Sequence, residues 1–183
     1  MELKDINIER LMDLAVSGDN DAFKEIYKYF FTPVYKYVLI RTKRDDLAKD
    51  ISQTVFLKSF ENIKRYKYQG KSPLAYFFTV AKNEIINEWR KTRKTFNYSQ
   101  EEIKSKFQSE ENIERNTENK LQKDKIFKYL GLLTDEQKEL ISLKFISGLN
   151  NNEISEITGK SEEAVRQLQF RALKALKDLL RNE

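Results

Sequence analysis

Asn151-Asn-Glu-Ile-Ser-Glu-Ile-Thr-Gly-Lys-Ser-Glu-Glu-Ala-Val-Arg-Gln-Leu168 is the stretch that decides the fold. It predicts a short helix over residues 151–158, a turn at Gly159-Lys160 and a longer helix capped by Ser161. Glycine supplies the backbone freedom that a tight turn between two helices needs. The pattern is typical of a helix-turn-helix, whose second helix enters the major groove of DNA.

The two helices of this motif have an apolar side and a polar side. Ile154 and Ile157 are predicted to face inward, and Ala164, Val165 and Leu168 to lock the second helix against the first. The outward side is able to reach phosphates and base edges. It carries Lys160, Glu162, Glu163, Arg166, Gln167, Gln169 and Arg171. A packed helical hairpin that binds no DNA has the same spacing.

Upstream of the motif, the sequence divides into two patterned regions and a segment between them. Helical periodicity restarts after Thr134-Asp-Glu-Gln137, which forms a capping box. Between about Thr92 and Glu118, apolar residues are sparse and unperiodic, so this segment cannot bury enough surface to fold alone. We therefore expect a first domain over residues 1–94, a flexible linker over 95–118 and a second domain over 119–183.

The first domain is predicted to be a helical bundle. Periodicity predicts helices over residues 6–16 and from Asp21 onward, with Pro33 expected to kink or interrupt the second. Asp45-Asp46 is expected to cap the next helix, and Ser72-Pro73 to begin another. Aromatic residues recur at helical spacing, which is typical of bundle cores. The predicted fold class is all-α, with two small helical domains.

Composition excludes several classes of protein. The chain has 183 residues, a net charge of +5 and only 5 Gly and 2 Pro. It has no Cys and no His, so disulfides, thiolate metal sites, zinc fingers, zinc hydrolases and His-based triads are ruled out, and no cofactor is expected. There is no run of about 18 apolar residues, so we expect no membrane insertion and a cytoplasmic location. The modest positive charge fits both nucleic-acid binding and an ordinary Lys-rich surface.

The segment from Leu133 to Leu176 resembles region 4 of bacterial sigma factors, which reads the minus-thirty-five promoter element. Segments of the first domain resemble sigma region 2 in order and spacing. They are Asp21-Ala-Phe23 with Tyr27, Asp50 to Leu57, and Leu74 to Asn83 followed by Trp89-Arg-Lys. The short linker in place of a middle domain is similar to the extracytoplasmic-function (ECF) type of the sigma-70 family.

This resemblance implies partners for particular residues. Residues expected to dock on the beta-prime clamp helices of core RNA polymerase are Asp50, Gln53, Phe56, Leu57, Lys58 and Glu61. The beta flap is a further expected contact of the polymerase. Residues expected to read the minus-thirty-five element of promoter DNA are Lys160, Ser161, Glu162, Arg166, Gln167, Gln169 and Arg171.

The minus-ten element is expected to be bound as a separated strand, by the helix that begins at Pro73 and the loop before it. Tyrosines there can stack on an exposed base, cationic side chains attract phosphates, and Asn83 is the leading candidate for a base contact. The expected residues are Arg65, Tyr66, Lys67, Tyr68, Lys71, Asn83, Asn87, Arg90, Lys91, Arg93 and Lys94. The sequence departs from the family at Asn87 and Thr54, where acidic residues are common.

The resemblance therefore implies a non-enzymatic initiation factor that gives RNA polymerase its promoter specificity, with an anti-sigma protein as a further expected partner. A stand-alone helix-turn-helix regulator, with the first domain used for dimerisation, is the alternative. An enzyme acting on nucleic acid is disfavoured, because the sequence has no carboxylate cluster and no phosphate-binding glycine loop.

Overall fold

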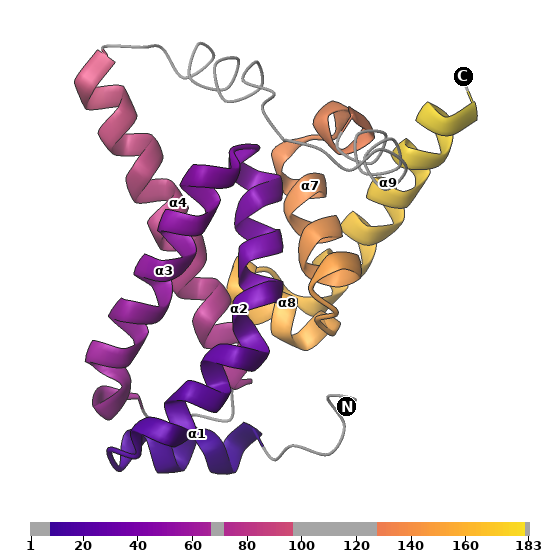
Figure 1. The fold of residues 1–183 in the computed structure, drawn as a ribbon. Helices are drawn as coiled ribbons and strands as arrows, with labels where there is room; N and C mark the ends of the chain where they lie inside the picture. The colour runs from indigo at the N-terminus through magenta and orange to yellow at the C-terminus, as the bar shows by residue number, and fades with distance from the viewer. Residues whose placement is uncertain (1–7, 67–71, 97–127, 182–183) are drawn as a thin grey trace, which may run out of the picture.

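The computed structural model describes residues 8–66, 72–96 and 128–181 (Figure 1). Regular structure in these ranges is helical, with no strand, which confirms the predicted all-α class. The N-terminal half contains α1 (Ile8–Val16), α2 (Asn20–Thr42), α3 (Asp45–Asn62), the 3-10 helix η2 (Ile63–Arg65) and α4 (Pro73–Phe96). The C-terminal half contains α7 (Asp135–Ile141), the π-helical turn η3 (Ser142–Ile146), α8 (Asn151–Thr158) and α9 (Glu162–Arg181).

Aromatic rings form the core of the N-terminal half. α2, α3 and α4 pack against one another, and α1 lies across one end of them (Figure 1). The ring of Phe77 lies 5.4 Å from that of Phe56 and 5.3 Å from that of Phe30, measured between centroids. All three side chains are buried. The aromatic periodicity therefore marks a bundle core, as predicted.

Pro33, which was expected to kink or interrupt the second helix, does not interrupt it. α2 continues through Pro33 to Thr42. Proline removes one N–H donor from the helical ladder. Phe30 and Val34, on either side, are buried among the other helices and hold the segment in place.

The start of α3 is also different. Arg44 is the N-cap residue, and no side chain caps the helix. The carboxylate of Asp45 instead accepts a hydrogen bond from the hydroxyl of Tyr35 on α2. The prediction of an Asp45-Asp46 cap is therefore wrong, because a tertiary contact engages the first carboxylate.

α4 begins at Pro73, as predicted, but it is longer than expected. It continues to Phe96 and so includes Thr95 and Phe96, which composition assigned to the linker. The rest of that linker, and the expected start of the second domain near residue 119, lie outside the described residues.

The helix-turn-helix is confirmed in the C-terminal half. Thr134 and Gln137 form the expected capping box at the start of α7. α8 covers residues 151–158, and Gly159 follows it in the left-handed region, with φ of 71°. Asn150 and Glu153 form a second capping box at the start of α8, which the sequence analysis missed.

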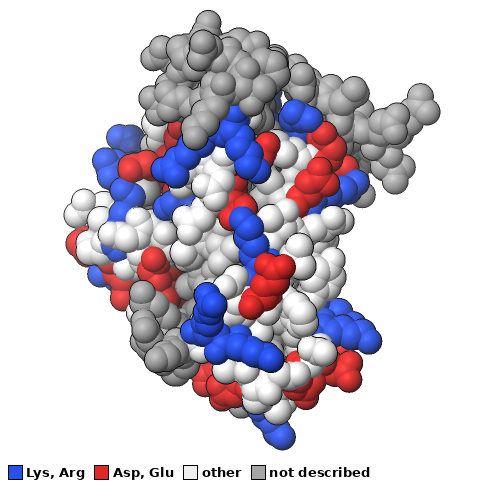
Figure 2. All heavy atoms as spheres, turned by 90° about the vertical axis from the view of Figure 1, so that its left-hand side faces the viewer, with Lys and Arg blue, Asp and Glu red and all other residues white. Residues whose placement is uncertain are grey.

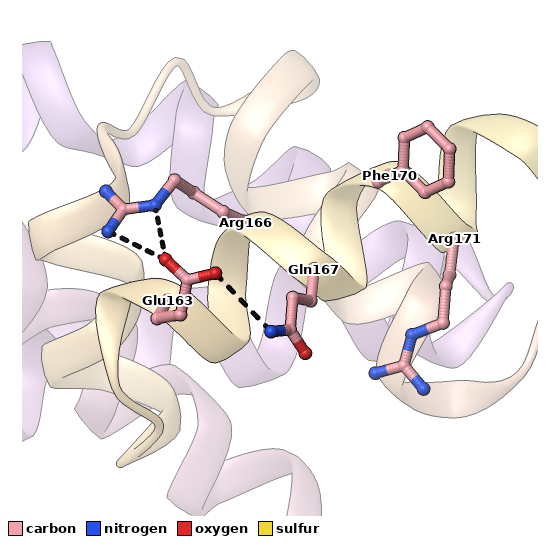
Figure 3. A pocket seen from close by; sticks show the side chains of 5 residues that line it. All are labelled: Glu163, Arg166, Gln167, Phe170 and Arg171. Carbon is pink, nitrogen blue, oxygen red and sulfur yellow. Dashed lines mark hydrogen bonds and ion pairs between the residues drawn. The ribbon is translucent and has the colours of Figure 1, made fainter.

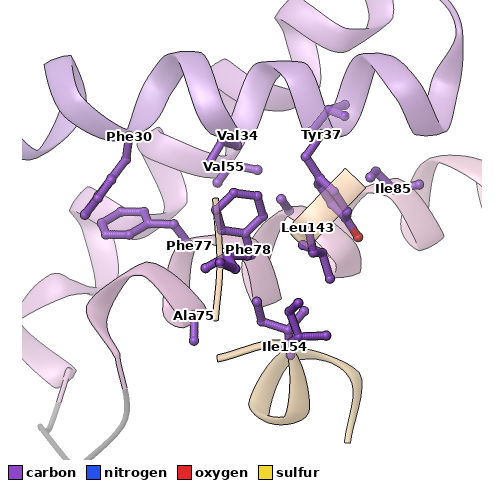
Figure 4. Close-up of a cluster of buried hydrophobic side chains, with 14 of the residues drawn as sticks. Phe30, Val34, Tyr37, Val55, Ala75, Phe77, Phe78, Ile85, Leu143 and Ile154 are labelled. Atoms are coloured by element: carbon purple, nitrogen blue, oxygen red, sulfur yellow. The ribbon is translucent and has the colours of Figure 1, made fainter. Parts of the chain in front are cut away.

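The two halves pack against each other. α8 lies against α4, and η3 lies against α2. Tyr37 and Phe78 from the N-terminal half and Leu143 and Ile154 from the C-terminal half are fully buried in one continuous core (Figure 4). The sequence predicts two separate units, and it contains no sign of this contact.

Candidate nucleic-acid interface

The turn of the helix-turn-helix is held by side-chain hydrogen bonds. The hydroxyl of Ser155, in the middle of α8, donates to the carbonyl oxygen of Lys160 in the turn at 2.6 Å, which joins the helix to the turn. The Ser161 hydroxyl accepts from the backbone N–H of Ala164 at 3.2 Å, as expected of an N-cap residue. Val165 is fully buried and holds the inner side of α9 against the core. The turn thus fixes the direction in which α9 presents its outer face.

A shallow hollow lies on the outer face of α9. It is lined by Glu163, Arg166, Gln167, Phe170 and Arg171 (Figure 3). Arg166 donates to the Glu163 carboxylate at 3.2 Å, and its guanidinium lies 3.7 Å from the Glu162 carboxylate. Gln167 donates to the other oxygen of Glu163 at 3.4 Å. More than half of the Arg166 side chain remains exposed, so these acidic partners are exchangeable for another anion.

Lys160 is bound to the neighbouring helix rather than extended into solvent. Its ammonium lies 2.8 Å from the carboxylate of Glu136, in the first turn of α7. This hydrogen bond, the charge of Lys160 and the more distant charge of Arg171 lower the pKa of Glu136. Glu136 therefore competes with a phosphate for the charge of Lys160.

Phe170 is the residue on this face that the sequence analysis missed. Its side chain is 70% exposed and lies at the same end of the hollow as Arg171 (Figure 3). Phe170 follows Arg166 by four residues, which places both on one side of a helix. Gln169, by contrast, is partly buried and does not line the hollow. Helical spacing from Arg166 could have identified Phe170.

Along α4, the predicted minus-ten residues follow one face of the helix. Asn83 is exposed, and Asn87 is partly buried and donates to the Glu84 carboxylate at 3.4 Å. Arg90 and Lys91 are exposed, and Lys91 pairs with an acidic residue one turn earlier. Arg93 and Lys94 belong to α4, but their side chains are not among those that the structure describes.

The loop before α4 is described only at its start. Arg65 is exposed at the end of η2. The ring of Tyr66 is partly buried and packs edge-on against Tyr76, with centroids 5.2 Å apart. Lys67, Tyr68 and Lys71, predicted to bind the separated strand, lie outside the described residues.

α3 carries the residues predicted to bind polymerase. Most of them are exposed: Asp50, Gln53, Leu57, Lys58 and Glu61. Phe56 is not, because only 3% of it is exposed and its ring packs on Phe77. Phe56 therefore lies on the inner side of α3, in the core, and not on the surface where the polymerase contact was predicted.

Two features of this surface add to the prediction. Leu57 is 59% exposed and Phe60 is 43% exposed, which gives α3 an apolar surface that the sequence analysis noted only at Leu57. The ammonium of Lys58 lies 2.7 Å from the carboxylate of Glu84 on α4. The polar face of α3 thus continues onto α4.

Positive and negative side chains alternate over the side of the molecule that Figure 2 shows. Basic side chains gather toward the top of this view, at the end of the molecule where α2 and α4 terminate in Figure 1. Within the described ranges, no group of three or more His, Cys, Asp or Glu residues is placed to hold a metal ion. No helix in these ranges has the length and apolar character needed to cross a membrane.

Comparisons with known proteins match both halves. The family model for Sigma-70 region 2 matches residues 26–95, and that for Sigma-70, region 4 matches residues 129–178. The ECF RNA polymerase sigma factor SigM of Bacillus subtilis is 31% identical over 156 residues, which cover 85% of this chain and 93% of SigM. The ECF RNA polymerase sigma factor BldN of Streptomyces coelicolor is 28% identical over 179 residues, covering 96% of this chain and 68% of BldN.

Solved structures share the fold. CnrH, in complex with the cytosolic domain of CnrY, superposes with a TM-score of 0.74 at 18% identity, covering 95% of this chain and 97% of CnrH. The sigma factor RpoE of Bartonella quintana, in complex with the anti-sigma factor NepR, superposes with a TM-score of 0.69 at 20% identity. That superposition covers 87% of this chain and 96% of RpoE.

Proposed function

Because the chain belongs to the sigma-70 family of RNA polymerase sigma factors, in its ECF group, we propose that it binds core RNA polymerase and directs it to promoters. The observation that carries this proposal is the presence of both sigma regions in one chain, in the family order. Each region presents a polar face: the outer face of α9 in one, and the faces of α3 and α4 in the other.

In this proposal, α9 reads the minus-thirty-five element in the major groove. An arginine can donate two hydrogen bonds to a guanine edge, and a glutamine can do the same for adenine. Arg166 and Gln167 lie side by side at the hollow and are suited to these roles. The exposed ring of Phe170 is suited to an apolar contact with a thymine methyl group. Arg171 and Lys160 supply charge for phosphates.

The N-terminal half captures the minus-ten element once its strands separate. Extruding a base from the duplex costs a few kcal/mol, so a protein that binds the extruded base favours the open state without ATP. We assign this contact to Asn83, which is exposed on α4. Arg90 and Lys91, two turns further along, hold backbone phosphates, and their contribution weakens as salt rises.

Polymerase binding is assigned to α3. Leu57 and Phe60 expose apolar surface among polar neighbours, which is the composition of a protein-protein contact. Asp50, Gln53 and Glu61 surround this surface and set its charge. The beta-prime clamp helices are the proposed partner of α3, and the beta flap that of the C-terminal half.

In this proposal the chain binds promoter DNA and positions polymerase on it, and polymerase performs the chemistry. We therefore propose no catalytic role for the chain, and we place it in the cytoplasm with polymerase. An anti-sigma protein is a further proposed partner. Support comes from the RpoE structure, in which a protein of the same fold is bound to the anti-sigma factor NepR. A stand-alone regulator is not favoured, because the N-terminal half matches region 2 rather than a dimerisation domain.

Run-off transcription tests the proposal. Purified chain is added to core polymerase from the same cells, with fragmented genomic DNA as template, and the transcripts are sequenced. New transcripts with defined start sites are expected only when both components are present. If no start site depends on the chain, the proposed function is wrong.

A further inference from the structure

Glu84 on α4 contacts a different side chain with each of its two carboxylate oxygens. The Oε2 atom lies 2.7 Å from the ammonium of Lys58 on α3. The Oε1 atom accepts a hydrogen bond from the side-chain nitrogen Nδ2 of Asn87, three residues further along α4, at 3.4 Å. Only 14% of the Glu84 side chain is exposed. Lys58 therefore holds the carboxylate in place from the neighbouring helix, and the carboxylate holds Asn87.

This contact determines which end of the Asn87 amide is left for a ligand. A carboxylate only accepts hydrogen bonds, whereas an asparagine side chain has a donating nitrogen and an accepting oxygen. The nitrogen of Asn87 must face Glu84, because the reverse orientation would place two acceptors against each other. Among the described residues, none donates a hydrogen bond to the Oδ1 atom of Asn87. The oxygen of Asn87 is thus the group that can bind a ligand.

Asn87 belongs to the face of α4 that carries the candidate strand-binding residues. Asn83 lies four residues before it and Arg90 three residues after it, which places all three on one side of the helix. Asn83 and Arg90 are exposed, and Asn87 is partly buried. An unpaired carboxylate beside this face would repel a phosphate backbone, but the ammonium of Lys58 neutralises Glu84. A strand bound along α4 can therefore bring a base to the oxygen of Asn87.

We propose that Glu84 is a positioning residue, which fixes the Asn87 amide so that Asn87 selects a base of the separated minus-ten strand. This inference rests on the proposed function. Adenine and cytosine carry an amino group, N6 or N4, that donates to an acceptor such as the Asn87 oxygen. Guanine and thymine carry an oxygen, O6 or O4, at the same place on the ring. The fixed amide therefore favours adenine or cytosine over guanine and thymine at one position of the element.

The base preference of the holoenzyme tests this proposal. Forked fragments of a promoter found by run-off transcription carry an unpaired minus-ten strand, in which each position in turn is adenine, cytosine, guanine or thymine. Dissociation constants are compared for wild type and for Asn87→Ala, which identifies the position that Asn87 reads. At that position, wild type should bind the adenine or cytosine fragment about five-fold more tightly than the guanine and thymine fragments. Asn87→Ala should lose this preference.

Glu84→Gln tests the positioning role. Glutamine has nearly the same shape, but it can offer Asn87 either a donor or an acceptor, so the orientation of the Asn87 amide is no longer fixed. The preference should fall from about five-fold to below about two-fold. Loss of a negative charge strengthens binding of all four fragments alike, so it leaves this ratio unchanged. In the Asn87→Ala background, Glu84→Gln should not change the ratio further, because the residue that it positions is absent.

The matched control is Glu88→Gln, which makes the same substitution at the next acidic residue of α4. The Glu88 carboxylate lies 3.3 Å from the ammonium of Lys91, and the variant should keep the wild-type ratio. NMR of the free chain follows the amide itself. The side-chain amide signals of Asn87, identified by their absence in Asn87→Ala, should shift in Glu84→Gln and stay in place in Glu88→Gln. Circular dichroism checks that the helix content of each variant is unchanged.

A further measurement uses only the wild-type chain. Replacing the favoured adenine by purine, or the favoured cytosine by the pyrimidinone that lacks the amino group, should weaken binding about five-fold. The proposal is overturned by a preference for guanine or thymine at the position of Asn87, by equal binding without the amino group, or by an unchanged ratio in Glu84→Gln. It is also overturned if Asn87→Ala alters the preference at no position. Failure of the proposed function is seen separately, as absence of run-off transcripts, and the NMR signals test the contact between Glu84 and Asn87 without polymerase.

Discussion

The guanidinium carbon of Arg41 lies 5.2 Å from the centroid of the Trp89 ring. The same guanidinium donates to the carbonyl oxygen of Asp135 in the other half at 3.0 Å. One side chain on α2 therefore links α4 to the start of α7. Because Trp89 is the only tryptophan in the chain, its fluorescence reports on this junction.

Replacing Arg41 should weaken this junction. Arg41→Met removes a cation–π contact and a hydrogen bond while keeping an apolar side chain over the ring, so we expect the free energy of unfolding to fall by about 1–2 kcal/mol. Trp89 emission should change, because the charged guanidinium no longer lies over the ring. Urea titrations followed by fluorescence and circular dichroism measure both effects. Lys24→Met, an exposed position on the same helix, should change neither. Unaltered emission in Arg41→Met would contradict the role of this contact.

A β-carbon at Gly159, in the turn of the helix-turn-helix, should lower the stability of the protein. Gly159 has φ of 71°, a conformation that costs other residues roughly 1–2 kcal/mol, so Gly159→Ala should destabilise the protein by about that amount. The surrounding space is open, so strain in the backbone is the cause. Gly131→Ala is the control: its new β-carbon meets only the mobile end of the Lys43 side chain, at 3.2 Å. Equal melting temperatures for the two variants would show that the turn is not strained.

Local signals in the sequence were sufficient for the helix-turn-helix. Gly159, Ser161 and the Thr134 capping box each act within a few residues, and each is found as predicted. Contacts between residues far apart in the chain could not be predicted from such local signals. The pairing of Lys82 with Glu139 joins residues far apart in the chain, and neither residue has an unusual local context.

The predictions for Asp45 and Phe56 were wrong for similar reasons. Aspartate is a residue type that often caps helices, but the hydroxyl of Tyr35 donates a hydrogen bond to the Asp45 carboxylate. Helical periodicity alone does not reveal this contact between two helices. Phe56 was placed on the polymerase face because the resemblance to sigma region 2 implies a polymerase contact for this stretch of the chain. Its ring instead stacks on Phe77 of α4 and packs against Tyr27 and Phe31 of α2, in a core that only the packing of the three helices defines. Roles of the site residues on α4 and α9 stay predictions.

The stabilisation that Tyr35 provides should be lost at alkaline pH. Burial, and next the hydrogen bond to Asp45, raise the pKa of Tyr35 to about 12, above the usual value near 10. A raised pKa in the folded state favours folding below pH 10, and this stabilisation is lost as the pH rises from 10 to 12. The difference in unfolding free energy between wild type and Tyr35→Phe should therefore be constant below pH 10 and shrink above it. Urea titrations of both proteins from pH 8 to about 12 measure this difference, and one that does not shrink would contradict the assignment.

Phe170 should matter for promoter recognition and not for stability. Its side chain is 70% exposed, so Phe170→Ala removes little packing, and the melting temperature should change by less than about 2 °C. If the ring contacts a thymine methyl group, its loss should weaken binding of holoenzyme to its promoter by about ten-fold, or roughly 1.4 kcal/mol.

The matched control for Phe170 is Leu180→Ala, which removes another exposed apolar side chain from α9, ten residues beyond Phe170. It should leave promoter binding unchanged, because its position lies outside the face that enters the groove. Binding is measured with promoter fragments obtained from the run-off transcripts, and also with fragments in which each thymine of the minus-thirty-five element is replaced by uracil, which lacks the methyl group. Phe170→Ala should lose sensitivity to one of these replacements, since the contact is already absent. If every replacement weakens the variant as much as the wild type, Phe170 does not read that methyl group.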